Sequence, residues 1–133
     1  MPSDADDSLG SSSIPKHIYG WFEDNRTNSR NRCRFHGSFL VDAQFHLQQG
    51  VIIDDYGLAR IEEGYFDSEQ GLLSFRKTYV SKSALGNTFS YHFLLNPITQ
   101  IYEGDYECED RNGKTACMVT SVDSKLLKLL IQS

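Results

Sequence analysis

Hydrophobic and polar side chains alternate in short runs along this chain. From Phe89 to Leu95 an apolar residue stands at every second position, and from Tyr102 to Cys108 apolar residues and glycine alternate with acidic ones. An alternation of period two separates the two faces of a β-strand. With turn residues between the runs, the pattern predicts strands over 17–24, 32–43, 45–54, 58–67, 71–81, 88–96, 100–110 and 114–122.

The connections between these runs are short. Most are too short for a crossover to a parallel strand, so neighbouring strands should pair antiparallel. A meander of eight such strands loses both of its edges when it closes, which predicts an all-β, antiparallel up-and-down barrel. A two-sheet sandwich is the competing architecture.

Four glycine–any–aromatic tripeptides support a curved sheet. Residues two apart on a strand face the same way, so each copy sets a glycine beside an aromatic ring on one face. Rings packed over glycine are a known device of curved and closed sheets. We expect the rings of all four copies to point inward. The copies begin at Gly20, Gly37, Gly64 and Gly104.

The two ends of the chain depart from this pattern. Residues 1–16 are rich in Ser, Asp and Gly and should form a disordered tail, which leaves 17–133 as a single barrel domain. Near the C-terminus, Leu126, Leu127 and Leu130 stand at helical spacing. They predict a short helix that packs on the barrel wall or plugs one end.

Composition narrows the classes of function. The chain has 133 residues and a formal net charge of −5, which argues against a nucleic-acid binder. No apolar run is long enough to cross a membrane and no signal peptide is visible, so the expected location is the cytoplasm. The four histidines show no paired metal-ligand spacing, and the three cysteines form no Cys-x-x-Cys pair. We therefore expect neither a metal nor a cofactor.

One lysine stands among the rings expected inside the barrel. Lys77 shares a strand face with Phe75 and Tyr79. An ammonium group among rings needs a partner, for which Glu62 and Glu63 on the preceding strand are candidates. Lys77 would either anchor the carboxylate or carbonyl of a ligand, or serve the fold as an ion pair or by reaching out of the barrel mouth. The rings would either fill the barrel or line a pocket for an apolar ligand. The predicted ligand-binding residues are Phe75, Lys77, Tyr79, Tyr91, Phe93 and Tyr106.

A disulfide is one interpretation of the last hairpin. Asn112-Gly113 is a preferred pair for a two-residue type I′ turn. If these residues form the turn, Cys108 and Cys117 lie opposite each other, close enough for a cross-strand disulfide. The alternative is two reduced, buried thiols. Cys33 has no evident partner.

Two charged strand faces suggest a different function. Arg30, Arg32 and Arg34 share one face, and the acidic residues of strand 100–110 share another. Either face could bind a protein partner of opposite charge. The default for both is a solvated outer surface of the sheet.

The expected architecture resembles the calycin superfold, which comprises lipocalin-, avidin- and fatty-acid-binding-like barrels. The resemblance covers about residues 17–130 and is carried by Gly20-Trp21 on the first strand, the meander and the C-terminal helix. It implies an interior that binds a small apolar or amphipathic ligand, with a minority of isomerases and lyases. A non-enzymatic ligand-binding barrel is therefore the leading hypothesis. A protein-interaction module is the alternative, and a lipocalin-like isomerase or lyase comes third.

Overall fold

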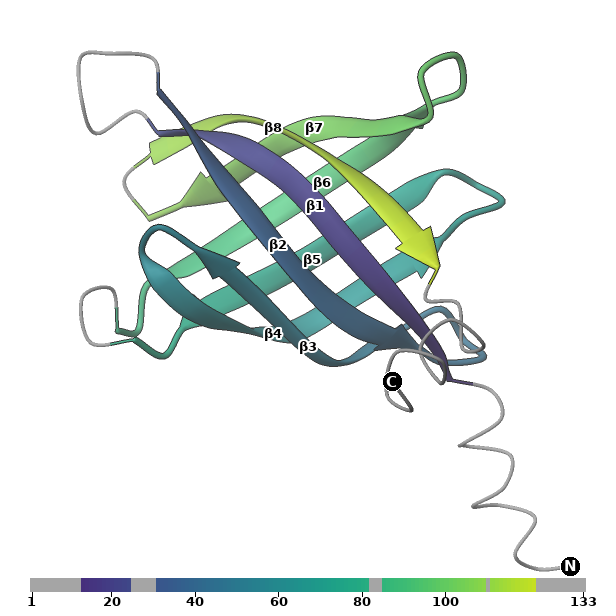
Figure 1. Ribbon diagram of the computed structural model, residues 1–133, viewed down its shortest axis with the longest axis horizontal. Coiled ribbons are helices and arrows are strands. Elements are labelled where there is room, and N and C mark those ends of the chain that lie inside the picture. Colours follow the sequence, from purple (N-terminus) through teal and green to yellow (C-terminus); the bar gives the residue numbers. More distant parts are fainter. Residues whose placement is uncertain (1–12, 25–30, 82–84, 110, 122–133) are drawn as a thin grey trace, which may run out of the picture.

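The chain forms a closed barrel of eight antiparallel strands (Figure 1). The computed structural model describes residues 13–24, 31–81, 85–109 and 111–121. Each strand pairs with the next one along the chain, and the last pairs with the first, so the sheet has no free edge. The strands are β1 (Ile14–Asp24), β2 (Asn31–Val41), β3 (Leu47–Asp54), β4 (Gly57–Asp67), β5 (Leu72–Tyr79), β6 (Thr88–Asn96), β7 (Ile101–Cys108) and β8 (Arg111–Ser121).

The predicted fold class is confirmed, and the pairing of β1 with β8 excludes an open two-sheet sandwich. Strand β6 spans the predicted residues, whereas β1 begins at Ile14, three residues before its predicted start. Most of the predicted tail and the predicted C-terminal helix lie outside the described residues. The closed barrel is compatible with a calycin-like fold. Within the described ranges, no helix is long and apolar enough to cross a membrane.

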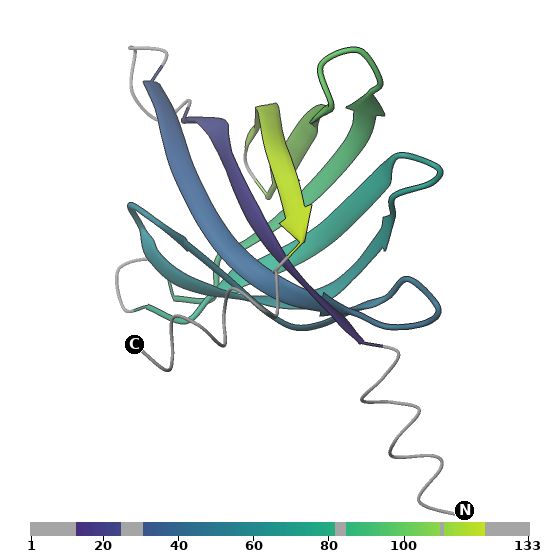
Figure 2. The same ribbon diagram turned by 45° about the vertical axis from the view of Figure 1, so that its right-hand side comes forward.

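The glycine–aromatic tripeptides shape the barrel wall as predicted. Their four inward rings, Phe22, Phe39, Phe66 and Tyr106, are at most 5 % exposed. Gly104 shows why glycine is needed, because a Cβ at this position would lie only 1.7 Å from a backbone carbonyl oxygen of β6. The missing side chain lets β7 approach β6 more closely than any other residue would allow. Figure 2 shows the strands curving around one shared interior.

The last hairpin turns earlier than predicted. Cys108 pairs with Arg111, so the chain reverses before Asn112-Gly113, which lies inside β8. Cys117 pairs with Tyr102, so the predicted pairing of Cys108 with Cys117 is wrong, and no disulfide joins the two cysteines. Because β8 must match β7 on one side and β1 on the other, this double pairing outweighs the local turn preference of Asn-Gly. The observed partner of Cys108, Arg111, stands six residues before the predicted partner, Cys117. Because this shift in register is an even number of residues, the side chains of β8 keep their predicted inward and outward faces.

Candidate functional site

The amino group of Lys77 lies inside the barrel, near the end that carries the β3–β4 turn. We call this end the mouth. The Lys77 side chain is completely buried, and its Nζ lies 2.8 Å from Oδ2 of Asp54, whose side chain is also completely buried. Removing two charges from water is costly, so such a pair persists only where attraction and further hydrogen bonds offset that cost.

Three residues donate hydrogen bonds to the Asp54 carboxylate. Besides Lys77, the Tyr79 hydroxyl donates to Oδ2, and the Tyr56 backbone N–H donates to Oδ1 at 2.8 Å. The bond from Tyr56 forms the Asx turn between β3 and β4. The sequence analysis did not identify Asp54 as the counter-ion of Lys77. Its spacing of two from the inward-facing Ile52 was the signal that could have revealed it.

Glu62 and Glu63 are not the partners of Lys77, so this prediction is wrong. The pairing of β4 with β5 is irregular between Ile61 and Glu63. Glu62 and Glu63 are both exposed residues. The Thr78 hydroxyl donates to Glu62, and Glu63 forms an ion pair with Arg76 at 3.1 Å. The irregularity in β4 turns Glu63 outward, and Lys77 pairs with Asp54 of β3 instead.

Five aromatic rings surround the ammonium group of Lys77. Their centroids lie 4.8 to 5.8 Å from Nζ, within the range of cation–π attraction. None of the five residues is more than 4 % exposed. Sequence reasoning did not connect the rings from β1 and β2 with the lysine, because those strands lie far from β5 in the chain. This Lys77 cage consists of Phe22, Phe35, Tyr79, Phe89 and Tyr91.

The structure brings the other predicted ligand-binding residues into the same ring cluster. Phe75 and Phe93 stack on Tyr91, with ring centroids 4.8 and 5.9 Å away. Tyr106 lies 5.9 Å from the same ring, and its hydroxyl donates to the backbone carbonyl of Glu23. These side chains pack on one another, so at this level of the barrel the rings fill the interior.

The hydroxyl of Tyr91 differs from those of Tyr79 and Tyr106, which both donate hydrogen bonds. It is buried and finds no hydrogen-bond partner among the described residues. Burial, with the neighbouring Tyr79 and Asp54, raises the pKa of Tyr91 well above its usual value. An unpaired buried hydroxyl costs about 1–3 kcal/mol. The hydroxyl is therefore a polar group that a guest molecule could satisfy.

A hollow of about 670 Å³ opens at the mouth. Its wall includes Phe89, which also belongs to the Lys77 cage and pairs with Lys77 across β5 and β6. The guanidinium of Arg111 lies 5.2 Å from the Phe89 ring centroid. Phe89 is thus a residue that the hollow and the Lys77 cage share. The hollow, which we call the mouth hollow, is lined by Gly86, Asn87, Thr88, Phe89, Cys108, Glu109 and Arg111.

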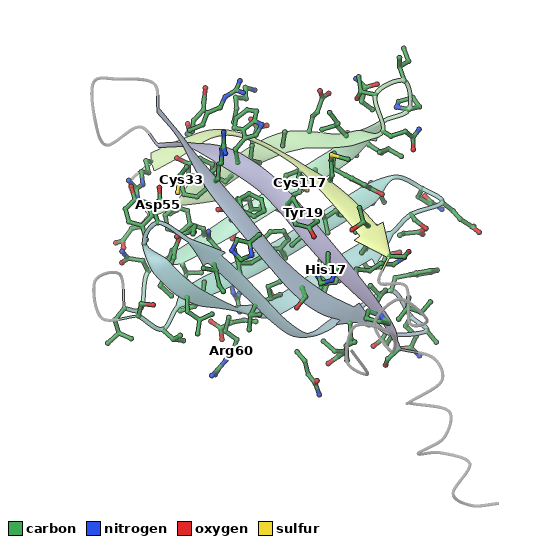
Figure 3. The ribbon with its side chains drawn as sticks, in the orientation of Figure 1. His17, Tyr19, Cys33, Asp55, Arg60 and Cys117 are labelled. Carbon is green, nitrogen blue, oxygen red and sulfur yellow. The ribbon has the colours of Figure 1, made fainter. Side chains whose placement is uncertain are left out.

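Burial sets the protonation of the groups around the cage. Burial lowers the pKa of Lys77, and the attraction and hydrogen bond of Asp54 oppose this shift. Burial and the bond to Asp54 raise the pKa of Tyr79, which keeps its hydroxyl protonated as a donor. Burial also raises the pKa of the Cys33 thiol to about 11. Cys33 lies beside Asp55 at the mouth (Figure 3) and stays a protonated thiol at neutral pH.

A second hollow, of about 470 Å³, lies on the outer surface of β1, β2 and β8. There the Arg32 guanidinium stacks over the Trp21 ring at 3.8 Å, and Arg34 pairs with Trp21 across the strands. Tyr19 and Met118 line the same hollow and are half exposed. Arg30, the third arginine of the predicted patch, lies outside the described residues.

The part of the chain that the structure describes contains no cluster of three or more His, Cys, Asp or Glu side chains able to hold a metal ion. No family model matches the sequence, and no curated protein matches it.

Proposed function

We propose that the barrel binds a small amphipathic ligand at its mouth, with Lys77 as the main polar contact. One observation carries this proposal: a fully buried ammonium–carboxylate pair stands inside five rings, next to a hydroxyl without a described partner. Apolar residues in place of a buried ion pair often stabilise a fold as well or better. Strongly perturbed ionisable groups of this kind concentrate at functional sites.

The mouth hollow offers the route to this site. Its volume of about 670 Å³ falls in the range of small-molecule sites. A ligand that moves the Phe89 ring aside would rest its apolar part on the rings of the cage. Its oxygen would accept hydrogen bonds from Lys77 and Tyr91. Each hydrogen bond from a charged donor is worth about 1.5–3 kcal/mol.

A matched pair of probe molecules tests this function. Acetophenone and ethylbenzene have nearly the same shape and differ in one carbonyl oxygen. We expect acetophenone to bind at least tenfold more tightly, which corresponds to about 1.4 kcal/mol. Native mass spectrometry and thermal-shift titration of the full chain measure both affinities. Equal affinities, or no binding of either probe, would contradict the proposal.

The variant Tyr91→Phe checks the contact from the other side. Without ligand, we expect it to raise the free energy of unfolding by about 1 kcal/mol, because it removes an unpaired buried hydroxyl. It should also weaken acetophenone binding. Tyr79→Phe is the control, because its hydroxyl donates to Asp54 and its loss should destabilise the fold. A Tyr91→Phe variant that is less stable than the wild type would show that the hydroxyl already has a partner.

The outer hollow favours a second function, the binding of an acidic protein segment with aromatic side chains. The observation behind it is the stacking of Arg32 on Trp21 beside exposed apolar groups. We expect an acidic Glu/Tyr copolymer to bind the wild type, and Arg30/Arg32/Arg34→Glu to abolish binding while the far-ultraviolet circular dichroism is unchanged. The control is Arg60→Glu, which changes an exposed arginine on β4 (Figure 3). If both variants lose binding equally, the hollow is not the binding surface.

A further inference from the structure

The charges at Lys77 distinguish between the two head groups that a ligand could bring. Lys77 and Asp54 already neutralise each other at 2.8 Å, with both side chains fully buried. A ligand carboxylate would bring a second negative charge next to Asp54, in a place without water to solvate it. The neutral oxygen of an aldehyde or ketone adds no charge. If the proposed ligand site exists, its charge balance therefore favours a carbonyl compound.

A primary amine and a carbonyl group can do more than form a hydrogen bond. We propose that Lys77 holds aldehydes as a reversible protonated imine, with Asp54 as its counter-ion, an inference that rests on the proposed ligand site. Lysines in desolvated surroundings are the ones that proteins use as amine nucleophiles toward carbonyl groups. The ligand class is then a small aldehyde with an apolar, preferably aromatic, body.

The proton transfers of this step can all run through Asp54. Lys77 first passes one proton to Asp54 along their hydrogen bond, which frees the nitrogen lone pair. The nitrogen attacks the carbonyl carbon, and the oxygen takes the proton from Asp54 to become a hydroxyl group. The nitrogen then gives a second proton to Asp54. The carbon–oxygen bond breaks, the hydroxyl leaves with that proton as water, and the nitrogen lone pair forms the carbon–nitrogen double bond. No oxidant or reductant is needed.

The product fits the site electrostatically. The reaction converts one ammonium into one iminium, so the buried pair keeps its balanced charge. The five rings that face Nζ at 4.8 to 5.8 Å attract the iminium as they attract the ammonium. Their packing also excludes bulk water, the reactant that would hydrolyse the imine. The lowered pKa of Lys77 increases the share of free amine that can react.

Reductive trapping on the full chain tests this inference. The native protein is incubated with a low concentration of benzaldehyde and sodium cyanoborohydride, and peptide mass spectrometry locates each mass gain of one benzaldehyde less one oxygen atom. Lys114 is the internal control, because it makes a similar ion pair with Asp105 at 3.0 Å, but on the surface with 70 % of its side chain exposed. We expect Lys77 to be modified at least tenfold faster than Lys114 in the native state. The two rates should become similar in urea.

The variant Asp54→Asn provides a second measurement. It keeps a side-chain oxygen for the Tyr56 N–H, but it cannot carry the protons. Trapping at Lys77 should slow at least tenfold, while trapping at the exposed Lys114 of the same variant keeps its wild-type rate. If acetophenone binds the wild type but Lys77 reacts no faster than Lys114, the imine is overturned and the ligand site stands. If acetophenone does not bind and Lys77 is not trapped, both proposals fail.

Discussion

We expect Lys77→Met to lower the free energy of unfolding by about 3–5 kcal/mol. Methionine matches the length of the lysine stem and suits the ring cage, so lost packing contributes little. The loss arises because the Asp54 carboxylate keeps its place inside the barrel without a positive partner. Urea denaturation of the full chain, followed by far-ultraviolet circular dichroism, measures the change.

Two further variants separate the charge effect from packing. In Lys77→Met/Asp54→Asn no charge remains, and the asparagine oxygen can still accept the Tyr56 N–H, so we expect most of the lost stability to return. Lys114→Met breaks an exposed ion pair and should change stability by less than about 1 kcal/mol. A double variant as unstable as Lys77→Met would show that the charge pair does not govern the stability of this site.

The second large effect is expected at Gly104. We expect Gly104→Ala to destabilise the barrel by about 3 kcal/mol or to prevent folding, the upper end of what overpacking costs. The new Cβ would lie 1.7 Å from the His92 carbonyl oxygen and 2.9 Å from the Phe93 Cα. Both atoms belong to the backbone, so no side-chain rotation relieves the contact, and β6 and β7 would have to separate. Thermal unfolding measures the loss.

Gly86→Ala is the matched control for this prediction. A Cβ at Gly86 meets nothing within 4 Å, but the residue has a φ of 84°, which strains any other side chain. We expect a cost of about 1 kcal/mol, since only the backbone conformation opposes the change. Equal costs at the two positions would contradict the idea that close strand approach, rather than conformation, explains the glycine at 104.

Alternation along single strands made much of this barrel predictable. The inward position of Lys77 follows from its spacing to Phe75 and Tyr79, and no distant contact is needed to infer it. The inward rings next to glycine follow from the same rule of two. Such patterns are local because the pleat of a strand assigns each side chain to a face regardless of its partners.

The partner of Lys77 could not be found in this way. Asp54 lies 23 residues earlier in the chain and two strands away, and it reaches the lysine only because β3, β4 and β5 curve around one interior. Glu62 faces outward because it directly follows the inward Ile61, and the irregular pairing after Ile61 turns Glu63 outward as well. A bulge of this kind depends on how two strands fit together, and neither strand shows it alone.

Local pattern thus determines the strands of this protein, the face to which each side chain belongs and the presence of a lysine among inward rings. Pairing between strands decides the rest. It sets the closure of β8 onto β1, the register that separates Cys108 from Cys117, and the approach of Asp54 to a cage of rings from β1, β2, β5 and β6. The physical reason is the range of the interactions. The pleat assigns each side chain to a face with a period of two residues, so a local pattern reveals it. Register and charge pairing depend on contacts between strands, so the free energy of the whole closed sheet decides them.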